Sequence, residues 1–229
     1  MYVVSLILSR CVSPVHGSGL SPFEVIPAVM EYSAAFTAGA LLHQESVQVI
    51  AAVQEHGDLQ AADPDVLTAN SKRARERKTR EVVRRLQQME RSVWRDFLDD
   101  SVAEQKMTLY YGVLKTYRLL FDFHMDVVLP RWRSLDRRIT PHDARRFLER
   151  RADQHPELDT WSPSTWQKVR QVMLKMLSES GLLYENTLQA PALPDAYWHR
   201  FVRVGDIWFL EAALLNERTR TAILEAATS

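Results

Sequence analysis

The chain has 229 residues, which at roughly 150 residues per domain allows one or two domains. Its hydrophobic content of 46% and charged content of 25% are typical of a globular protein and exclude a disordered, fibrous or low-complexity chain. The single cysteine, Cys11, excludes an internal disulfide and a thiolate zinc cage, so we expect a reducing, cytoplasmic location.

Residues 1–28 are expected to form a flexible or loosely docked extension. Within it, residues 16–22 have the glycine, serine and proline content of a linker. The apolar stretch around Leu6 is far shorter than the ~18 residues that a membrane helix needs. It also lacks the basic residues and cleavage pattern of a secretory signal, so we expect neither a membrane partner nor secretion.

Residues 29–100 are predicted to form an N-terminal helical lobe. Gly57 is expected to stop its first helix, and Asp63-Pro64 has the residue types of an N-cap followed by proline at the first helical position. The predicted helices cover about residues 41–55, 64–69 and 72–89. The third of these helices is expected to continue toward Phe97. The order and short connections of the three helices are typical of a helix-turn-helix element.

Residues 101–130 are predicted to form one long central helix. Ser101 and Glu104 have the spacing of a capping box at its start, and Pro130 is expected to lie just beyond its end. At up to ~28 residues this helix would be about 40 Å long. Gly112 is the expected position of a kink.

Residues 131–229 are predicted to form a C-terminal helical lobe. Thr140-Pro141 and Ser162-Pro163 each have the residue types of a helix start, and Gly181 those of a helix end. The predicted elements are helices over about 141–152 and 163–181, a small hairpin over 182–190, and one or two helices over 195–217. Helix, turn, helix and hairpin is the order of a winged helix. The expected fold is therefore all-α and compact, with two helix-turn-helix-like elements and one wing-like hairpin.

The net charge of zero conceals two basic segments. Residues 72–91 contain nine Lys and Arg against three Glu, and residues 131–151 contain eight Arg against three acids. These two segments carry 17 of the 29 positive charges. Such segregation creates a local positive field that favours an anionic partner.

The first basic segment separates its charges from its apolar residues. At helical spacing, Val82, Leu86, Met89 and Val93 form an apolar stripe. The opposite side carries arginines without an acidic residue among them, and these are Arg73, Arg77, Arg80, Arg84 and Arg91. Guanidinium groups match the geometry of phosphate oxygens, so we predict that the first four bind DNA. The alternative interpretation is a plain solvated helix face.

The second candidate surface lies on residues 141–181. Its last helix has an apolar stripe that we interpret as core, formed by Trp166, Val169, Val172, Met173, Met176 and Leu177. The opposite face has the residue types of a recognition helix, and its candidate DNA-binding residues are Ser164, Gln167, Lys168, Gln171 and Lys175. The preceding helix adds Arg145 and Arg146 as candidates. The alternative is a purely structural helical subdomain.

Motifs for catalysis are missing from the sequence. It has no nucleophile elbow, no glycine-rich phosphate loop followed by Lys and Ser or Thr, and no HExxH. His124 lies between Asp122 and Asp126, but residues two apart on a helix point in different directions. We therefore predict no catalytic residue, no metal and no cofactor.

Four segments between Tyr32 and Leu193 form a recognisable series of motifs. They are Tyr32-x-x-x-Phe36-Thr37-x-Gly39 with Leu41-Leu42 and Glu45-Ser46; Lys72-Arg73 with Lys78-x-x-x-Val82-x-x-Arg85-Leu86; Tyr111-x-x-Leu114-x-x-Tyr117-Arg118-x-Leu120-x-x-Phe123; and Ser162-Pro163-Ser164-Thr165 with Leu174-x-x-Leu177-x-x-Ser180-Gly181-Leu182-Leu183. In their order and spacing, these segments together resemble the BrxA family of bacterial BREX (bacteriophage exclusion) defence systems. The chain departs from the family pattern at residues 1–28 and at Lys115, where a smaller or apolar residue is expected.

The resemblance implies an all-helical protein that has two helix-turn-helix-like elements beside positive patches and binds double-stranded DNA. It also implies that the protein acts together with a methyltransferase and other components of the defence system. The two elements would fall on residues 64–89 and 141–181. We therefore expect a non-enzymatic, weakly sequence-selective DNA-binding protein. The alternatives are a scaffold that docks acidic partner proteins and an RNA-binding helical protein.

Overall fold

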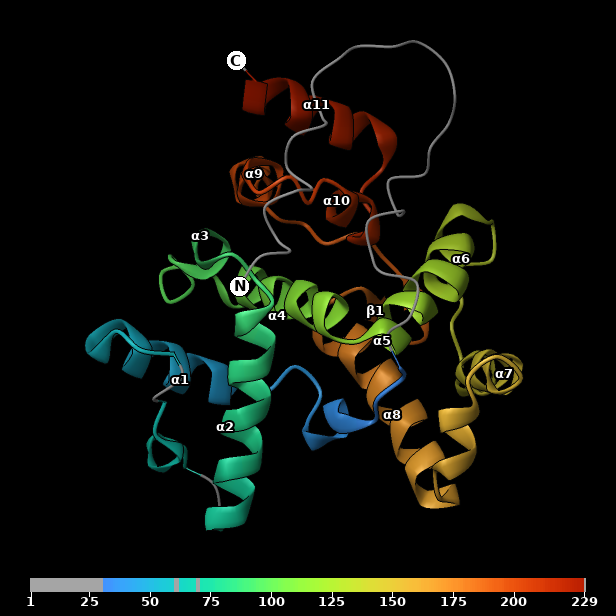
Figure 1. Cartoon of the computed structure of the whole chain (residues 1–229). Helices are drawn as coiled ribbons and strands as arrows, with labels where there is room; N and C mark the ends of the chain where they lie inside the picture. The colour runs from blue at the N-terminus through green and yellow to red at the C-terminus, as the bar shows by residue number, and fades with distance from the viewer. Residues whose placement is uncertain (1–30, 60–61, 69–70, 229) are drawn as a thin grey trace, which may run out of the picture.

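The computed structural model describes residues 31–59, 62–68 and 71–228, and these form an almost entirely helical protein (Figure 1). The expected extension over residues 1–28 lies outside the described residues. The α-helices are α1 (His43–His56), α2 (Lys72–Gln87), α3 (Arg91–Trp94), α4 (Val102–Thr116), α5 (Arg118–Phe123), α6 (Leu129–Arg133), α7 (Pro141–Ala152), α8 (Pro163–Glu179), α9 (Asp195–Arg203), α10 (Trp208–Ala212) and α11 (Glu217–Thr228).

Short helical turns and one hairpin connect these helices. The turns η1 (Ala35–Ala38), η2 (Pro64–Val66) and η4 (Pro156–Thr160) are 3₁₀-helical, whereas η3 (His124–Val128) is π-helical. The strands β1 (Leu183–Tyr184) and β2 (Thr187–Leu188) form an antiparallel hairpin. The predicted all-α fold with one small hairpin is thus confirmed.

The predicted helix starts are present because local capping chemistry specifies them. The Ser71 side chain accepts a hydrogen bond from Ala74 N at the start of α2, and Ser162 does the same for Thr165 N at the start of α8. Ser101 forms the predicted capping box of α4 with Glu104. The Asp63 carboxylate accepts a hydrogen bond from Asp65 N, but the predicted short helix after it is only the three-residue turn η2.

Two predicted helices are interrupted in the structure. The helix from Lys72 does not continue to Phe97: α2 ends at Gln87, where Gln88 N turns back to the carbonyls of Arg85 and Leu86, and α3 begins at Arg91. This turn lets the chain bury both Trp94 and Phe97 in the core.

The predicted central helix is divided at Tyr117 rather than at Gly112. The Tyr117 backbone is extended, with φ −122° and ψ 105°, so α4 and α5 are separate helices. The helical path also does not stop before Pro130, because Pro130 lies in the first turn of α6. Proline is tolerated there because the π-helical turn η3 directly before it shifts the hydrogen-bond pattern, as Leu129 N donates to the His124 carbonyl oxygen five residues back.

The C-terminal region follows the predicted order of elements. Gly181 has the left-handed φ of +83° expected of a residue that ends a helix. The hairpin turn places Glu185 and Asn186 at φ 45° and 63°, as a two-residue turn of this handedness requires. The helix α11 extends past the predicted range and packs on α9.

The core is one continuous cluster of buried apolar side chains from Tyr32 to Ile223. The predicted stripe residues of α2 and α8 are buried in it, except that Trp166 is half-buried. The turn η1 contacts both α2 and α8 and lies between them (Figure 1). Across the described residues, every helix is too short or too polar to cross a lipid bilayer.

Candidate nucleic-acid interface

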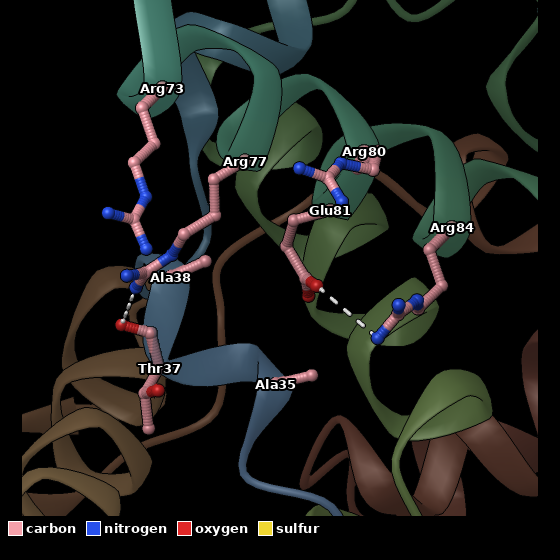
Figure 2. Close-up of a pocket in the computed structure, with 8 residues that line it drawn as sticks. All are labelled: Ala35, Thr37, Ala38, Arg73, Arg77, Arg80, Glu81 and Arg84. Carbon is pink, nitrogen blue, oxygen red and sulfur yellow. Dashed lines mark hydrogen bonds and ion pairs between the residues drawn. The ribbon is translucent and has the colours of Figure 1, made fainter. Parts of the chain in front are cut away.

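The exposed side of α2 carries a row of four arginines, Arg73, Arg77, Arg80 and Arg84, which we call the arginine row. The eleven residue-to-residue steps from Arg73 to Arg84, at about 1.5 Å each, give the row a length of about 16 Å. Together with η1 it surrounds a pocket of about 380 Å³ (Figure 2). The pocket is lined by the arginine row, Glu81, Ala35, Thr37 and Ala38.

Most of the arginine row has no carboxylate partner among the described residues. Arg77 Nη2 donates to the Thr37 carbonyl oxygen at 2.9 Å, and Arg80 Nε donates to the Glu76 carbonyl oxygen at 3.4 Å. Within the described part of the chain, no carboxylate lies within 4.0 Å of the guanidinium nitrogens of Arg73, Arg77 or Arg80. These charges are therefore available to an external anion.

Glu81 is the acidic group of this pocket, and its charge is compensated mainly from inside the protein. Its Oε2 lies 4.0 Å from Arg84 Nη1. Its Oε1 accepts hydrogen bonds from Arg85 Nε at 2.7 Å and from the Tyr117 hydroxyl at 2.6 Å. Burial and the neighbouring Glu81 charge raise the pKa of Tyr117 well above its usual value. Figure 2 shows the Glu81 carboxylate between the side chains of Arg80 and Arg84.

The buried guanidinium of Arg85 holds η1 in place beside the arginine row. Its Nη1 donates to the Ala40 carbonyl oxygen at 2.6 Å, and its Nη2 donates to the Gly39 carbonyl oxygen at 3.1 Å. On the other side, the Phe36 ring contacts the Tyr117 ring edge to face, with centroids 5.3 Å apart. The floor of the pocket is thus fixed by α2 and by the break between α4 and α5.

The predicted face of α8 is exposed along its length, and its residues are Ser164, Gln167, Lys168, Gln171 and Lys175. Ser164 Oγ is 2.9 Å from Ser162 Oγ, and Lys175 Nζ is 3.5 Å from Glu179 Oε1. The side chains of Gln167, Lys168 and Gln171 have no hydrogen-bond or ionic partner among the described residues.

The α2 and α8 surfaces flank the same short segment. Glu179 Oε2 accepts a hydrogen bond from Leu41 N at 2.8 Å, just beyond η1. Lys168 and Lys175 project within about 40° of Glu179 around the α8 axis, so they lie on the side of α8 that faces this segment. Two patches that are separate in the sequence therefore border one surface.

The arginines of α7 behave differently from the arginine row. Arg145 Nε lies 3.6 Å from Glu149 Oε1, so its charge has a partner. Arg146 lines another pocket, of about 370 Å³, which it shares with Arg150 and two acids, Asp126 and Asp143. Burial would raise the pKa of Asp143, but hydrogen bonds from Thr140 and Arg131 bring it below its usual value. This pocket shares no lining residue with the arginine row.

A family model for BrxA matches residues 30–200 of the chain. The chain belongs to the BrxA family. A BREX protein BrxA from Bacillus cereus (strain H3081.97) is 24% identical over 123 residues, which cover 54% of this chain and 62% of that relative. The family resemblance inferred from the sequence is therefore confirmed.

The BrxA-family chain also shares its fold with a solved structure. The crystal structure of an uncharacterized protein from Magnetospirillum magneticum superposes with a TM-score of 0.66 and 20% sequence identity. The match covers 80% of this chain and 98% of that protein. At this level of identity the similarity concerns the fold alone.

Several residues that shape the interface of this BrxA-family chain are missing from the sequence-based candidates. Glu81 and Arg85 are four residues apart on one helix, which is a spacing that predicts an ion pair. Glu179 has the same spacing from Lys175. No sequence signal indicates that Arg85 and Glu179 bind the backbone next to η1, because those contacts join segments more than 40 residues apart.

Lys115, the departure from the family pattern, has a defined place in the structure. Its Nζ lies 2.7 Å from Asp206 Oδ2 and above the Tyr111 ring, 5.3 Å from the centroid. Burial would raise the pKa of Asp206, but hydrogen bonds from Lys115 and Tyr111 lower it. The ammonium group therefore links α4 to the segment before α10.

In the stretches that the structure describes, no three His, Cys, Asp or Glu side chains gather as metal ligands. The buried His124 has the Tyr110 hydroxyl 2.7 Å from its Nδ1. Burial lowers the pKa of His124 to about 3. This histidine is therefore a neutral core residue at physiological pH.

Proposed function

We propose that this BrxA-family chain is a non-enzymatic component of BREX phage defence that binds double-stranded DNA, mainly through phosphate contacts and with low sequence selectivity. The observation that carries the proposal is the arginine row, in which three guanidinium groups have no carboxylate partner among the described residues. Other components of the same defence system are the expected protein partners.

The arginine row suits a DNA backbone for electrostatic and geometric reasons. Five N–H donors on each planar guanidinium bind phosphate oxygens in a forked geometry. Duplex DNA carries about one negative charge per 1.7 Å of helix axis, so a row about 16 Å long faces several phosphates at once. Release of their counterions on binding favours the complex and makes it sensitive to salt.

The α8 face adds groups of a different chemistry. Gln167 and Gln171 offer amides that can donate to and accept from base edges in the major groove. Lys168 and Lys175 offer point charges for phosphates on the same side of α8. Because charged contacts outnumber amide contacts, we expect affinity to depend more on phosphates than on base sequence.

A salt series with a labelled duplex tests the electrostatic mechanism. If about six phosphates are contacted, affinity falls about 10³-fold between 50 and 200 mM salt. The triple variant R77E/R80E/R84E should lose duplex binding while its far-ultraviolet circular dichroism stays unchanged. Affinity that does not change with salt would contradict the proposed mechanism.

A charge-matched control separates local from global effects. Arg95, Arg203 and Arg218 are exposed and lie outside the α2–η1–α8 surface. The variant R95E/R203E/R218E changes the net charge by the same amount as the first triple variant. It should lower affinity far less, and equal losses would show that only net charge matters.

Competition experiments address the two other functions considered from the sequence. Duplex RNA that displaces duplex DNA at equal concentration would favour RNA binding, because A-form helices also present closely spaced phosphates. Partner proteins that stay bound in full yield after nuclease treatment would favour a scaffold.

A further inference from the structure

Glu179 brings a negative charge to a surface that we propose binds DNA. Its carboxylate has two different partners: Oε1 lies 3.5 Å from Lys175 Nζ, and Oε2 accepts the Leu41 N–H at 2.8 Å. The side chain is about one-third exposed, at 32%. A carboxylate here repels phosphates and competes for Lys175, so electrostatics alone gives no reason for its position.

The segment 37–41, to which Glu179 is bound, is also held by α2. Thr37 O accepts from Arg77, and the Gly39 and Ala40 carbonyls accept from Arg85. The next residue, Leu42, has a left-handed φ of 56°, a conformation that costs a non-glycine residue free energy. The segment therefore depends on contacts from both helices to keep its shape.

We propose that Glu179 is a positioning residue for DNA binding, which rests on the function proposed above. By holding Leu41 N, it fixes segment 37–41 against α8, while Arg77 and Arg85 fix the same segment against α2. The arginine row and the α8 lysines then keep one spacing, and a single duplex contacts both. Without Glu179, the segment has to be ordered during binding, and that ordering weakens affinity.

Three substitutions separate the role of Glu179 as a hydrogen-bond acceptor for the Leu41 N–H from the role of its negative charge. E179Q keeps an oxygen that accepts the Leu41 N–H but removes the charge, so duplex affinity should equal or exceed that of the unaltered protein. E179A removes both functions, and its affinity should fall about fivefold, as expected for losing one net hydrogen bond. E179D keeps the charge but is one methylene shorter, so it should resemble E179A.

Electrostatics alone predicts a different result for E179A and E179D. If Glu179 acted only through its charge, E179Q and E179A would both bind duplex DNA more tightly, and E179D would not change. Glu149 provides the matched control, since it is an exposed acid that pairs with Arg145 at the same helical spacing. E149Q and E149A should behave alike, because Glu149 holds no backbone amide in the described part of the chain.

Amide hydrogen exchange gives a readout that is independent of DNA. The Leu41 amide should stay protected in E179Q and exchange faster in E179A and E179D. All three variants should remain folded, because one half-buried hydrogen bond is a small part of a typical stability. If the unaltered protein binds no duplex, the proposed function and this inference both fail. If it binds but E179Q and E179A have equal affinity, only this inference fails.

Discussion

Glu81 and Arg85 form an ion pair one turn apart on α2, with Nε 2.7 Å from Oε1 and with 4% and 2% of their side chains exposed. Arg85 also donates to the carbonyls of Gly39 and Ala40, and Glu81 also accepts from the Tyr117 hydroxyl. A buried charge is tolerated only when it is paired and hydrogen-bonded, and both conditions hold here. The pair therefore supports the floor beneath the arginine row.

Replacing Arg85 by alanine should destabilise the protein by about 3–5 kcal/mol, because Glu81 would be left as an uncompensated buried charge. Urea unfolding at neutral pH measures this loss. The control is R145A, which breaks the exposed pair of Arg145 with Glu149 at the same helical spacing. It should cost less than about 1 kcal/mol. Similar losses in the two variants would mean that burial does not strengthen the α2 pair.

Removing one guanidinium from the arginine row should weaken binding to every duplex sequence alike. R80A is expected to reduce the slope of log affinity against log salt concentration by about 1, which corresponds to one lost phosphate contact. R218A, which removes an exposed arginine on α11, should leave the slope unchanged. An unchanged slope for R80A would remove Arg80 from the interface.

Unlike R80A, Q171A should change the preference between duplex sequences rather than the salt dependence of binding. An amide on α8 carries no charge, so its loss should leave the salt slope unchanged. If Gln171 reads a base edge, the variant should instead reduce the difference in affinity between duplex sequences, by up to about 1–3 kcal/mol at one position. Binding titrations over a small set of duplexes, each repeated at two salt concentrations, measure both quantities. A changed slope with unchanged sequence preference would make Gln171 a residue near phosphates only.

Local sequence signals predicted the helix starts and the exposed side of α2 correctly, because capping and helical periodicity depend on neighbours within one or two turns. The breaks at Gln87 and Tyr117 were not predicted. Tyr117 leaves the helical conformation where its hydroxyl reaches Glu81 and its ring reaches Phe36, which are both distant in the sequence. Tertiary contacts of this kind override helix propensity.

Only part of the candidate DNA-binding site could be predicted from the sequence. Periodicity placed Arg73 to Arg84 on one exposed face, and the structure has them there. The acid partners of Arg145 and Lys175 were missed although both lie four residues away. The proximity of α2 to α8 could not be predicted, because segment 37–41 joins them through its backbone groups, and these contacts depend on neither charge pattern nor spacing.

Gly112 does not interrupt α4 but lets Met89 pack closely against it. A Cβ at this position would lie 2.8 Å from Met89 Sδ and 3.0 Å from its Cε. These atoms are the far end of a flexible methionine side chain, which can shift at small cost, whereas replacing glycine by alanine in a helix gains about 1 kcal/mol. G112A should therefore change the free energy of unfolding by less than about 1 kcal/mol in urea unfolding, because the shift of Met89 offsets part of this gain.

The double variant isolates the part of this effect that comes from Met89. In the M89A background the side chain that would clash is absent, so G112A should stabilise the protein by up to about 1 kcal/mol relative to M89A alone. A destabilising effect in both backgrounds would show that α4 is close to another group, such as the Arg85 carbonyl 3.6 Å from the same Cβ position.

His124 should make the protein sensitive to mild acid. Burial lowers its pKa to about 3, whereas an unfolded histidine has a pKa of about 6.5. Between these values the unfolded chain binds a proton that the folded protein does not, so stability falls as the pH decreases through this range. From pH 6.5 to pH 5 the loss should be about 2 kcal/mol from this residue.

Comparison with H124Q isolates this contribution from that of the carboxylates. Glutamine can either accept from or donate to the Tyr110 hydroxyl but does not titrate, so the stability of H124Q should fall less between pH 6.5 and pH 5. Urea unfolding midpoints at these two pH values measure the difference. H124Q will be less stable at neutral pH, because its shape differs from imidazole, and the comparison therefore uses the change with pH within each protein. Equal changes in both proteins would mean that His124 accepts a proton in the folded state, which would require water or an acidic group to reach the core.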